Sequence, residues 1–177
     1  VKFFNHRTGI DWQLLDKEVE KLVSLATARH VVQLLEVGWN HEPPYYVMEY
    51  LEGRVIWDST DGPYTQQQRF EFWDAANAAV AKLHQVDYRE VGLSDFGKES
   101  DYIARQLARW GGQYDYTRTV DNPYMDNLLD YLPANIPESE GCAIVHGDLQ
   151  IANMMMHSTR NEVIGLLDWE LSTLGCP

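Results

Sequence analysis

The sequence predicts an α+β fold in two parts, because the hydrophobic pattern changes twice along its 177 residues. Short β-rich runs broken by glycine and proline occupy much of residues 1–52. Helical periodicity dominates residues 65–132, and short strand-like runs return in residues 143–167. We therefore divide the chain into residues 1–52 and 53–177, with a connector rich in Gly, Asp and Pro near the boundary.

The first part contains signals for three strands and one helix. Residues 1–4 are apolar and aromatic around one lysine, which is typical of a strand. Asp11 leads a stretch whose leucines and valines keep mostly to one face, which predicts a helix. Two β-rich runs separated by a glycine and a Pro-Pro turn predict strands at residues 31–35 and 45–50.

The second part begins with three predicted helices. Thr65 and Gln68 have capping-box spacing, and a helix continues from them through Phe70, Trp73, Ala76, Val80 and Leu83. Ser100 is a candidate cap for a second helix, which we expect Gly111-Gly112 to stop. A third, short helix is expected around residues 125–132, ending before Pro133.

Three strand candidates follow, at residues 143–145, 153–156 and 163–167, the last two joined by a polar turn.

Charge and composition exclude several classes of function. The 27 Asp and Glu outnumber the 14 Lys and Arg, giving a net charge of −13, so a nucleic-acid partner is not expected. No apolar run approaches the length of a membrane span. The two cysteines form neither a disulfide framework nor a zinc pattern, which favours a reducing, cytoplasmic location.

The strongest chemical pattern follows the strand predicted at residues 143–145. It reads His146-Gly147-Asp148, with Asn153 five residues after the aspartate, and a further aspartate, Asp168, ends the last predicted strand. Phosphoryl transfer needs a carboxylate that orients the attacking hydroxyl and takes its proton, and amide and carboxylate oxygens that hold Mg²⁺. The alternative is a chance set of polar turn residues, but their order and strand context favour the catalytic interpretation.

These residues resemble the catalytic loop and metal-binding aspartate of the protein-kinase-like fold. Glycine stands where protein kinases usually carry arginine, so the motif is similar to the aminoglycoside phosphotransferase and choline kinase group of small-molecule kinases. Further stretches resemble the phosphotransferase domain that is found alone in bacteria and fused to acyl-CoA dehydrogenases in animals. They are residues 83–87, 91–98, 102–110, 132–137 and 167–175.

The resemblance covers about residues 45–177 and implies roles for individual side chains. Asp148 is then the catalytic base, Asn153 and Asp168 are the metal ligands, and His146 braces the loop. Gln150 stands where the family tends to carry a basic residue, so one contact to the transferred phosphate is expected to be absent. The implied cofactors are ATP and Mg²⁺.

The first fifty residues resemble the amino-terminal lobe of a bacterial Ser/Thr protein kinase. Lys2 and Glu18 are similar to the strand lysine and helix glutamate that position nucleotide phosphates. Glu20 is the alternative to Glu18: the spacing favours Glu18, whereas Glu20 fits an ordinary surface face.

Residues 45–53 resemble the hinge that binds adenine. This likeness implies that Met48 is the gatekeeper and that the Glu49 carbonyl and the Leu51 N–H face the base. Because the two parts resemble different kinase branches, a join between two lineages near residues 47–53 is one hypothesis.

None of the twelve glycines belongs to a Gly-rich phosphate loop, and the sequence ends soon after Asp168. We therefore expect a two-lobed, protein-kinase-like fold that is truncated at both ends.

The predicted function is ATP- and Mg²⁺-dependent phosphoryl transfer to a hydroxyl of a small molecule. The resemblance implies a hydroxyacyl or aminoglycoside-like acceptor, and fusion or association with an acyl-CoA dehydrogenase in relatives. Two alternatives stay open. The absent Gly-rich loop suggests a catalytically impaired pseudokinase or interaction module, and residues 1–53 suggest a Ser/Thr protein kinase.

Overall fold

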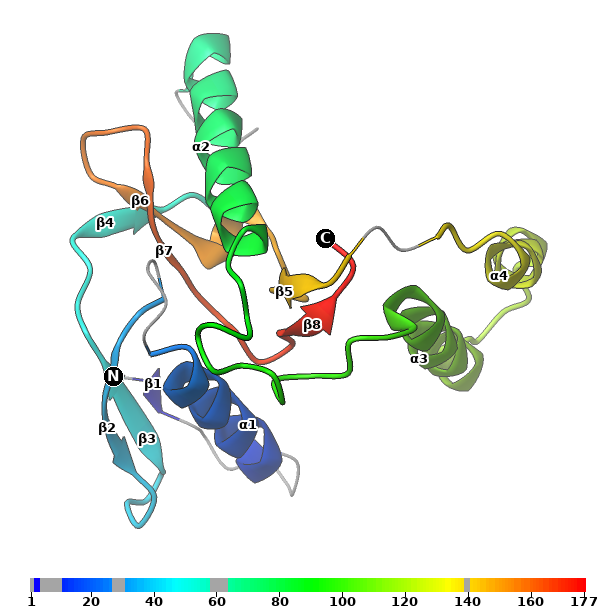
Figure 1. Ribbon diagram of the computed structural model, residues 1–177, viewed down its shortest axis with the longest axis horizontal. Coiled ribbons are helices and arrows are strands. Elements are labelled where there is room, and N and C mark those ends of the chain that lie inside the picture. Colours follow the sequence, from blue (N-terminus) through cyan, green and yellow to red (C-terminus); the bar gives the residue numbers. More distant parts are fainter. Residues whose placement is uncertain (1, 4–10, 27–30, 58–63, 139–140) are drawn as a thin grey trace.

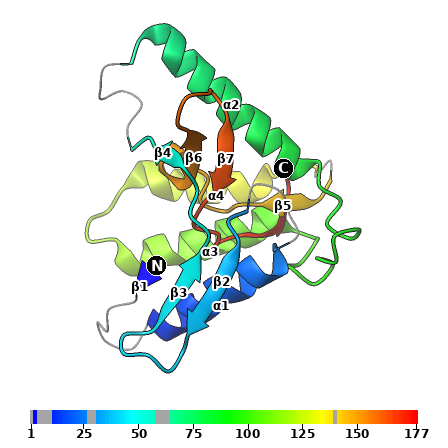
Figure 2. The same cartoon turned by 90° about the vertical axis from the view of Figure 1, so that its left-hand side faces the viewer.

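The computed structural model describes residues 2–3, 11–26, 31–57, 64–138 and 141–177, with side chains from residue 16 onward. Its first part is an antiparallel sheet with the strand order β1-β3-β2 and a helix, α1, beside it (Figures 1 and 2). These elements are β1 (Lys2–Phe3), α1 (Asp11–Ser24), β2 (Leu34–Gly38) and β3 (Tyr45–Met48). The strand, helix, strand, strand order predicted for this part is therefore confirmed.

The strand predicted at residues 31–35 is shifted along the chain, because β2 begins only at Leu34. Val31 instead forms a parallel bridge to Leu166 in the second part of the chain. The Gln33 N–H donates to the Glu49 carboxylate at 2.9 Å, and the Glu49 N–H donates to the Gln33 carbonyl at 2.9 Å. Val31 thus connects the two parts, whereas Gln33 is bound within the first part.

The second part contains two small antiparallel sheets. One has the order β4-β6-β7 and the other pairs β5 with β8. The strands are β4 (Gly53–Val55), β5 (Ala143–Val145), β6 (Met154–His157), β7 (Val163–Leu166) and β8 (Thr173–Gly175), and the 3₁₀ turn η1 (Ile151–Asn153) precedes β6. The sequence did not predict β4 or β8, since each has three residues that include a glycine and a polar residue, whereas the three residues of the predicted β5 are all apolar.

Helix α2 (Gln66–His84) packs against β5 and β7. Its amino terminus is the predicted capping box: Thr65 Oγ1 accepts from the Gln68 N–H, and the Gln68 side chain accepts from the Thr65 N–H. The buried residues of this helix are Phe72, Ala76, Ala79 and Leu83. Phe70 and Trp73, which belong to the apolar pattern that predicted the helix, are exposed.

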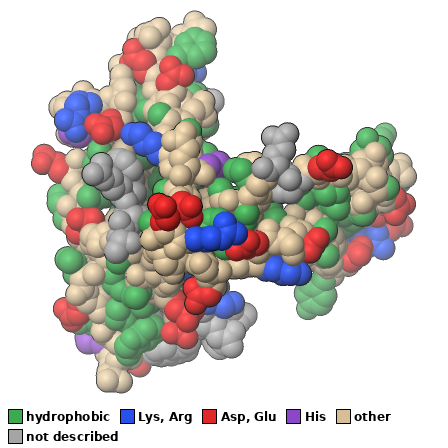
Figure 3. All heavy atoms as spheres, viewed as in Figure 1, with side chains coloured by type: hydrophobic (Ala, Val, Ile, Leu, Met, Phe, Trp, Pro, Cys, Tyr) green, Lys and Arg blue, Asp and Glu red, His purple; other side chains and the backbone are tan. Residues whose placement is uncertain are grey.

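Helices α3 (Tyr102–Thr117) and α4 (Pro123–Ala134) form a hairpin that projects from the rest of the molecule (Figures 1 and 3). Ser100 does not cap α3; the residue before the helix is Asp101, whose φ is 58°. Gly111-Gly112 does not stop α3, because glycine inside a helix is destabilising by only about 1 kcal/mol. A Cβ at Gly111 would lie 3.3 Å from Leu129, so glycine lets the two helices approach closely.

Pro133 lies inside the last turn of α4, which ends at Ala134 rather than before the proline.

The main core lies between α2 and the sheets of the second part, and it extends to α1 and β3. Its largest fully buried side chains include Trp169, Tyr46, Phe72 and Ile144. In the described ranges, no helix is both long enough and apolar enough to cross a membrane. Both cysteines are free thiols.

Candidate active site

The loop after β5 is held close to the segment after β7. His146 is only 2% exposed, and Gly147 has φ 84°, a left-handed conformation that favours glycine. A Cβ at Gly147 would collide with the carbonyl oxygen of Leu171. Glycine is therefore required here for two reasons, its backbone conformation and the closeness of a neighbouring backbone.

Asp148 and Asn153 are in direct contact across this loop, as their spacing predicts. The Asn153 side-chain amide donates to the Asp148 carbonyl oxygen at 2.9 Å and to the carboxylate Oδ2 at 3.1 Å. Gln150 donates to the same Oδ2 at 3.2 Å. Both donors bind one carboxylate oxygen, which fixes the Asp148 side chain. No hydrogen bond from the described residues reaches Oδ1, so this oxygen can interact with another molecule.

His146 binds the strand that leads to Asp168. Its Nε2 lies 2.8 Å from the Leu167 carbonyl oxygen, and its ring lies against Trp169 with 4.8 Å between ring centroids. Burial lowers the pKa of His146, although the bond to Leu167 acts in the opposite direction. The ring is therefore neutral near pH 7 and donates its Nε2 proton to that carbonyl.

Asn153 and Asp168 are brought to neighbouring positions by the β6–β7 hairpin. The Leu167 N–H donates to the Asn153 carbonyl oxygen at 2.8 Å, one residue before Asp168. Since its amide nitrogen is bound to Asp148, Asn153 has its side-chain oxygen left as a ligand. An amide oxygen and a carboxylate are donors that suit Mg²⁺.

Glu170 also lies close to Asp168 and Glu18, although the sequence did not single it out as a site residue. Oxygens of Glu18, Asp168 and Glu170 all lie within 4.8 Å of one another. Carboxylates this close repel one another unless cations or hydrogen-bond donors lie among them. The Asp168-Trp169-Glu170 spacing was the only available signal for Glu170, because its closeness to Glu18 depends on the fold.

The structure distinguishes Glu18 from Glu20. Glu18 is 3% exposed and accepts a hydrogen bond from the Tyr46 hydroxyl at 2.6 Å, whereas Glu20 is exposed. Lys2 lies in β1 opposite Tyr46, and its side chain is outside the described residues. The structure therefore brings Glu18 to Asp168, and the predicted pairing of Glu18 with Lys2 stays a prediction.

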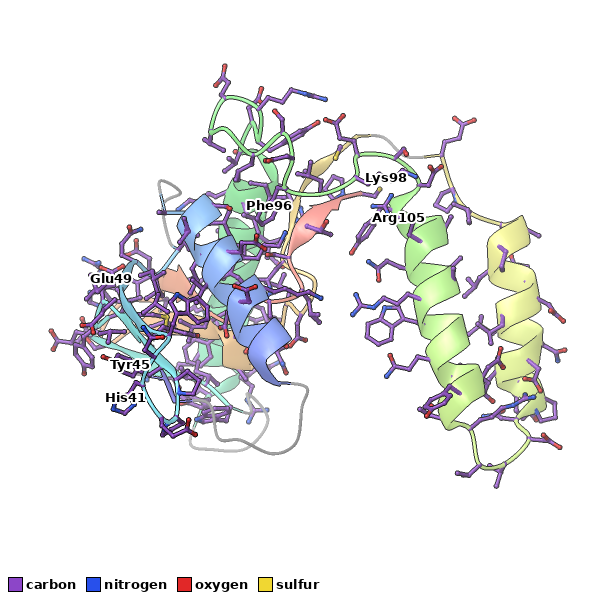
Figure 4. All side chains as sticks on the ribbon, turned by 90° about the horizontal axis from the view of Figure 1, so that it is seen from below. His41, Tyr45, Glu49, Phe96, Lys98 and Arg105 are labelled. Atoms are coloured by element: carbon purple, nitrogen blue, oxygen red, sulfur yellow. The ribbon has the colours of Figure 1, made fainter. Side chains whose placement is uncertain are left out.

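The predicted hinge connects β3 to β4. Met48 ends β3, and Glu49 is held by its two hydrogen bonds to Gln33 (Glu49 is labelled in Figure 4). Leu51 packs over β7, since a Cβ at Gly165 would lie 2.6 Å from its Cδ1. Within the described residues, the Glu49 carbonyl and the Leu51 N–H make no hydrogen bond, so both can bind another molecule.

Comparison with known proteins places this geometry in a family. The model of the phosphotransferase enzyme family matches residues 10–177. Acyl-CoA dehydrogenase family member 10 of Mus musculus is 37% identical over 134 residues, which cover 76% of this chain and 12% of that protein. The chain thus spans only a small part of this relative.

Two solved structures are similar over nearly the whole chain. A candidate aminoglycoside phosphotransferase from Ralstonia eutropha is 37% identical with a TM-score of 0.78, covering 90% of this chain and 50% of that one. Aminoglycoside-3'-phosphotransferase of type VIII is 24% identical with a TM-score of 0.66, covering 93% of this chain and 60% of that one.

These matches confirm the predicted α+β, protein-kinase-like fold. One family model matches both sides of residues 47–53, which contradicts the hypothesis of a join between two kinase lineages there. The chain therefore belongs to the phosphotransferase enzyme family.

Proposed function

We propose that this chain carries the catalytic centre of an enzyme that transfers the γ-phosphoryl group of ATP, with Mg²⁺, to a hydroxyl of a small molecule. The observation that carries the proposal is the contact of Asp148 with Asn153, next to Asp168, in a chain of the phosphotransferase family. A base and two oxygen ligands in this order are what phosphoryl transfer requires.

In this proposal Asp148 orients the acceptor hydroxyl and takes its proton through Oδ1, while its other oxygen stays bound to Asn153 and Gln150. The hydroxyl oxygen bonds to the γ-phosphorus as the bond to the leaving ADP oxygen breaks. Asn153 and Asp168 hold Mg²⁺, which neutralises phosphate charge when bound. His146 keeps the catalytic loop against the Asp168 segment.

The nucleotide is proposed to bind at the hinge. The Glu49 carbonyl and the Leu51 N–H face adenine, Met48 is the gatekeeper, and Lys2 held by Glu18 binds the phosphates. This assignment is supported by the backbone groups that the hinge leaves without partners in the described chain.

For the acceptor, we propose a hydroxylated acyl compound, since the mouse relative is named as an acyl-CoA dehydrogenase family member. Association with such a dehydrogenase in a reducing, cytoplasmic location is part of the same proposal. An aminoglycoside-like cation is the second candidate, supported by the name of the Ralstonia eutropha protein and by the acidic charge of −13.

The test measures Mg²⁺-dependent ATP turnover against a panel of hydroxyacyl thioesters, aminoglycosides and proteins. Asp148→Asn should lower kcat by about 10²- to 10⁴-fold, the usual contribution of a general base. Asp168→Ala should abolish metal-dependent nucleotide binding. Asp115→Asn, on the exposed side of α3, is the matched control and should leave both unchanged.

Other results of these assays would refute the proposal or favour one of the alternative functions. Full turnover by Asp148→Asn would refute its role as the base. Nucleotide binding without turnover of any acceptor would favour a pseudokinase or interaction module, and phosphorylation of proteins alone would favour a protein kinase.

A further inference from the structure

Two consecutive tyrosines of β3 hold two different carboxylates on opposite faces of their strand. The Tyr45 hydroxyl donates to exposed Glu36 at 2.7 Å, and its ring meets His41 edge-on at the turn of the β2–β3 hairpin (Figure 4). The Tyr46 hydroxyl donates to buried Glu18 at 2.6 Å. Successive side chains of a strand point to opposite faces, so the two bonds are alike in chemistry and differ in location.

Tyr46 lies where the two parts of the chain meet. Its side chain is 1% exposed, and the carboxylate it binds lies within 4.8 Å of the carboxylates of Asp168 and Glu170. A distance of 2.6 Å is typical of a strong O–H···O⁻ bond. The hydroxyl therefore fixes the Glu18 oxygen that it binds.

The phenol remains a donor at any physiological pH. Burial raises the pKa of Tyr46, and the bond to Glu18 and the charges of Asp168 and Glu170 raise it further. The Tyr46 hydroxyl itself is thus not a pH switch.

Helix α1 is held a second time, one turn after Glu18. Lys21 donates from Nζ to the Phe96 carbonyl oxygen at 2.9 Å, and the same nitrogen lies 3.7 Å from the centre of the Phe96 ring (Phe96 is labelled in Figure 4). Residues three apart lie on the same side of a helix, so Glu18 and Lys21 anchor one face of α1. Phe96 fixes the helix to the second part, and Tyr46 fixes its glutamate to the first sheet.

We infer that Tyr46 is a positioning residue, which acts through Glu18 to set the distance between α1 and Asp168 and thereby the affinity for Mg·ATP. This inference rests on the proposed function. The geometry assigns this role to Tyr46 because its hydroxyl joins the first sheet to Glu18. Among the described side chains of α1, Glu18 is the only buried glutamate.

The experiment compares Tyr46→Phe with Tyr45→Phe in the full chain. Both changes remove one hydroxyl that binds a carboxylate, and both keep the aromatic ring. Tyr46→Phe should weaken Mg·ATP binding by about tenfold or more, since bonds to charged groups are the stronger ones, and should raise KM more than it lowers kcat. Tyr45→Phe should leave affinity and KM at the wild-type values, because the Tyr45 hydroxyl binds exposed Glu36 and is not one of the hinge groups assigned to adenine.

A double-mutant cycle with Glu18→Gln tests whether Tyr46 acts through Glu18. If it does, the double variant binds Mg·ATP no more weakly than Glu18→Gln alone, because the two changes remove the same interaction. Additive losses would overturn the inference, and so would wild-type affinity in Tyr46→Phe.

Amide hydrogen exchange of residues 16–24 separates this inference from the proposed function. Tyr46→Phe should increase exchange in α1, whereas Tyr45→Phe should not, whether or not nucleotide binds. A wild-type protein that binds no Mg·ATP refutes the proposed function, and exchange alone then decides whether Tyr46 anchors α1. Unchanged exchange in Tyr46→Phe overturns the anchoring itself.

Discussion

Gly147 gives the most direct quantitative test of the catalytic-loop geometry. Two features disfavour a side chain at this position: the left-handed φ of 84°, and the Leu171 carbonyl, which a Cβ would contact too closely. Gly92 shares only the left-handed conformation, since its φ is 79° and a Cβ there would meet nothing within 4 Å. Alanine substitutions at the two glycines therefore separate backbone conformation from steric contact.

The expected destabilisation follows from these two contributions. A left-handed backbone costs a residue with a Cβ about 1 kcal/mol, and this is the whole effect expected for Gly92→Ala. Gly147→Ala adds overpacking against a backbone group, which costs about 1–3 kcal/mol. We expect Gly147→Ala to lower the free energy of unfolding by about 2–4 kcal/mol.

Urea unfolding measures both variants. With a slope of about 2 kcal/mol per molar urea, the midpoint should fall by about 1–2 M for Gly147→Ala and by about 0.5 M for Gly92→Ala. The slope itself should not change, because neither variant alters the surface exposed on unfolding. Equal midpoints for the two variants would refute the argument, since the Leu171 backbone would then move aside without cost.

Two further predictions concern α2 and His146. Thr65→Ala removes the acceptor for the Gln68 N–H and should lower the free energy of unfolding by about 1 kcal/mol in the same assay; an unchanged midpoint would show that the capping box is not stabilising. Because burial lowers the pKa of His146, the unfolded chain takes up a proton that the folded chain does not, so stability falls as pH drops below about 6.5. His146→Gln should reduce this loss between about pH 7 and pH 5, and identical pH profiles of unfolding for the two proteins would contradict the assignment.

Local signals in the sequence predicted local structure well. The capping box at Thr65 and Gln68 forms as expected because its partners are three residues apart and need no tertiary contact. The failures arise where tertiary packing decides. Gly111 lies inside α3 because α4 packs closely against it, and Phe72 is buried instead of Phe70 because α2 lies on β5 and β7.

The same distinction between local signals and tertiary packing holds for the residues of the candidate site. The contact between Asp148 and Asn153 could be predicted, since they lie five positions apart in one loop. The position of Glu170 beside Glu18 could not, because the two are far apart in sequence and meet only through the packing of α1. Tyr46 was missed for the same reason, as a buried tyrosine in a strand looks like an ordinary core residue.

The segment around Asp168 shows how the fold fixes the backbone that carries a functional side chain. Asp168 has φ 65°, a left-handed conformation that aspartate tolerates better than most residues. On one side, Leu167 is bound through its carbonyl to His146 and through its N–H to Asn153. On the other side, Trp169 is buried, and its ring nitrogen donates to the Leu166 carbonyl at 2.9 Å. The backbone on both sides of Asp168 is therefore fixed, and the direction of its carboxylate is set by the catalytic loop and the core together.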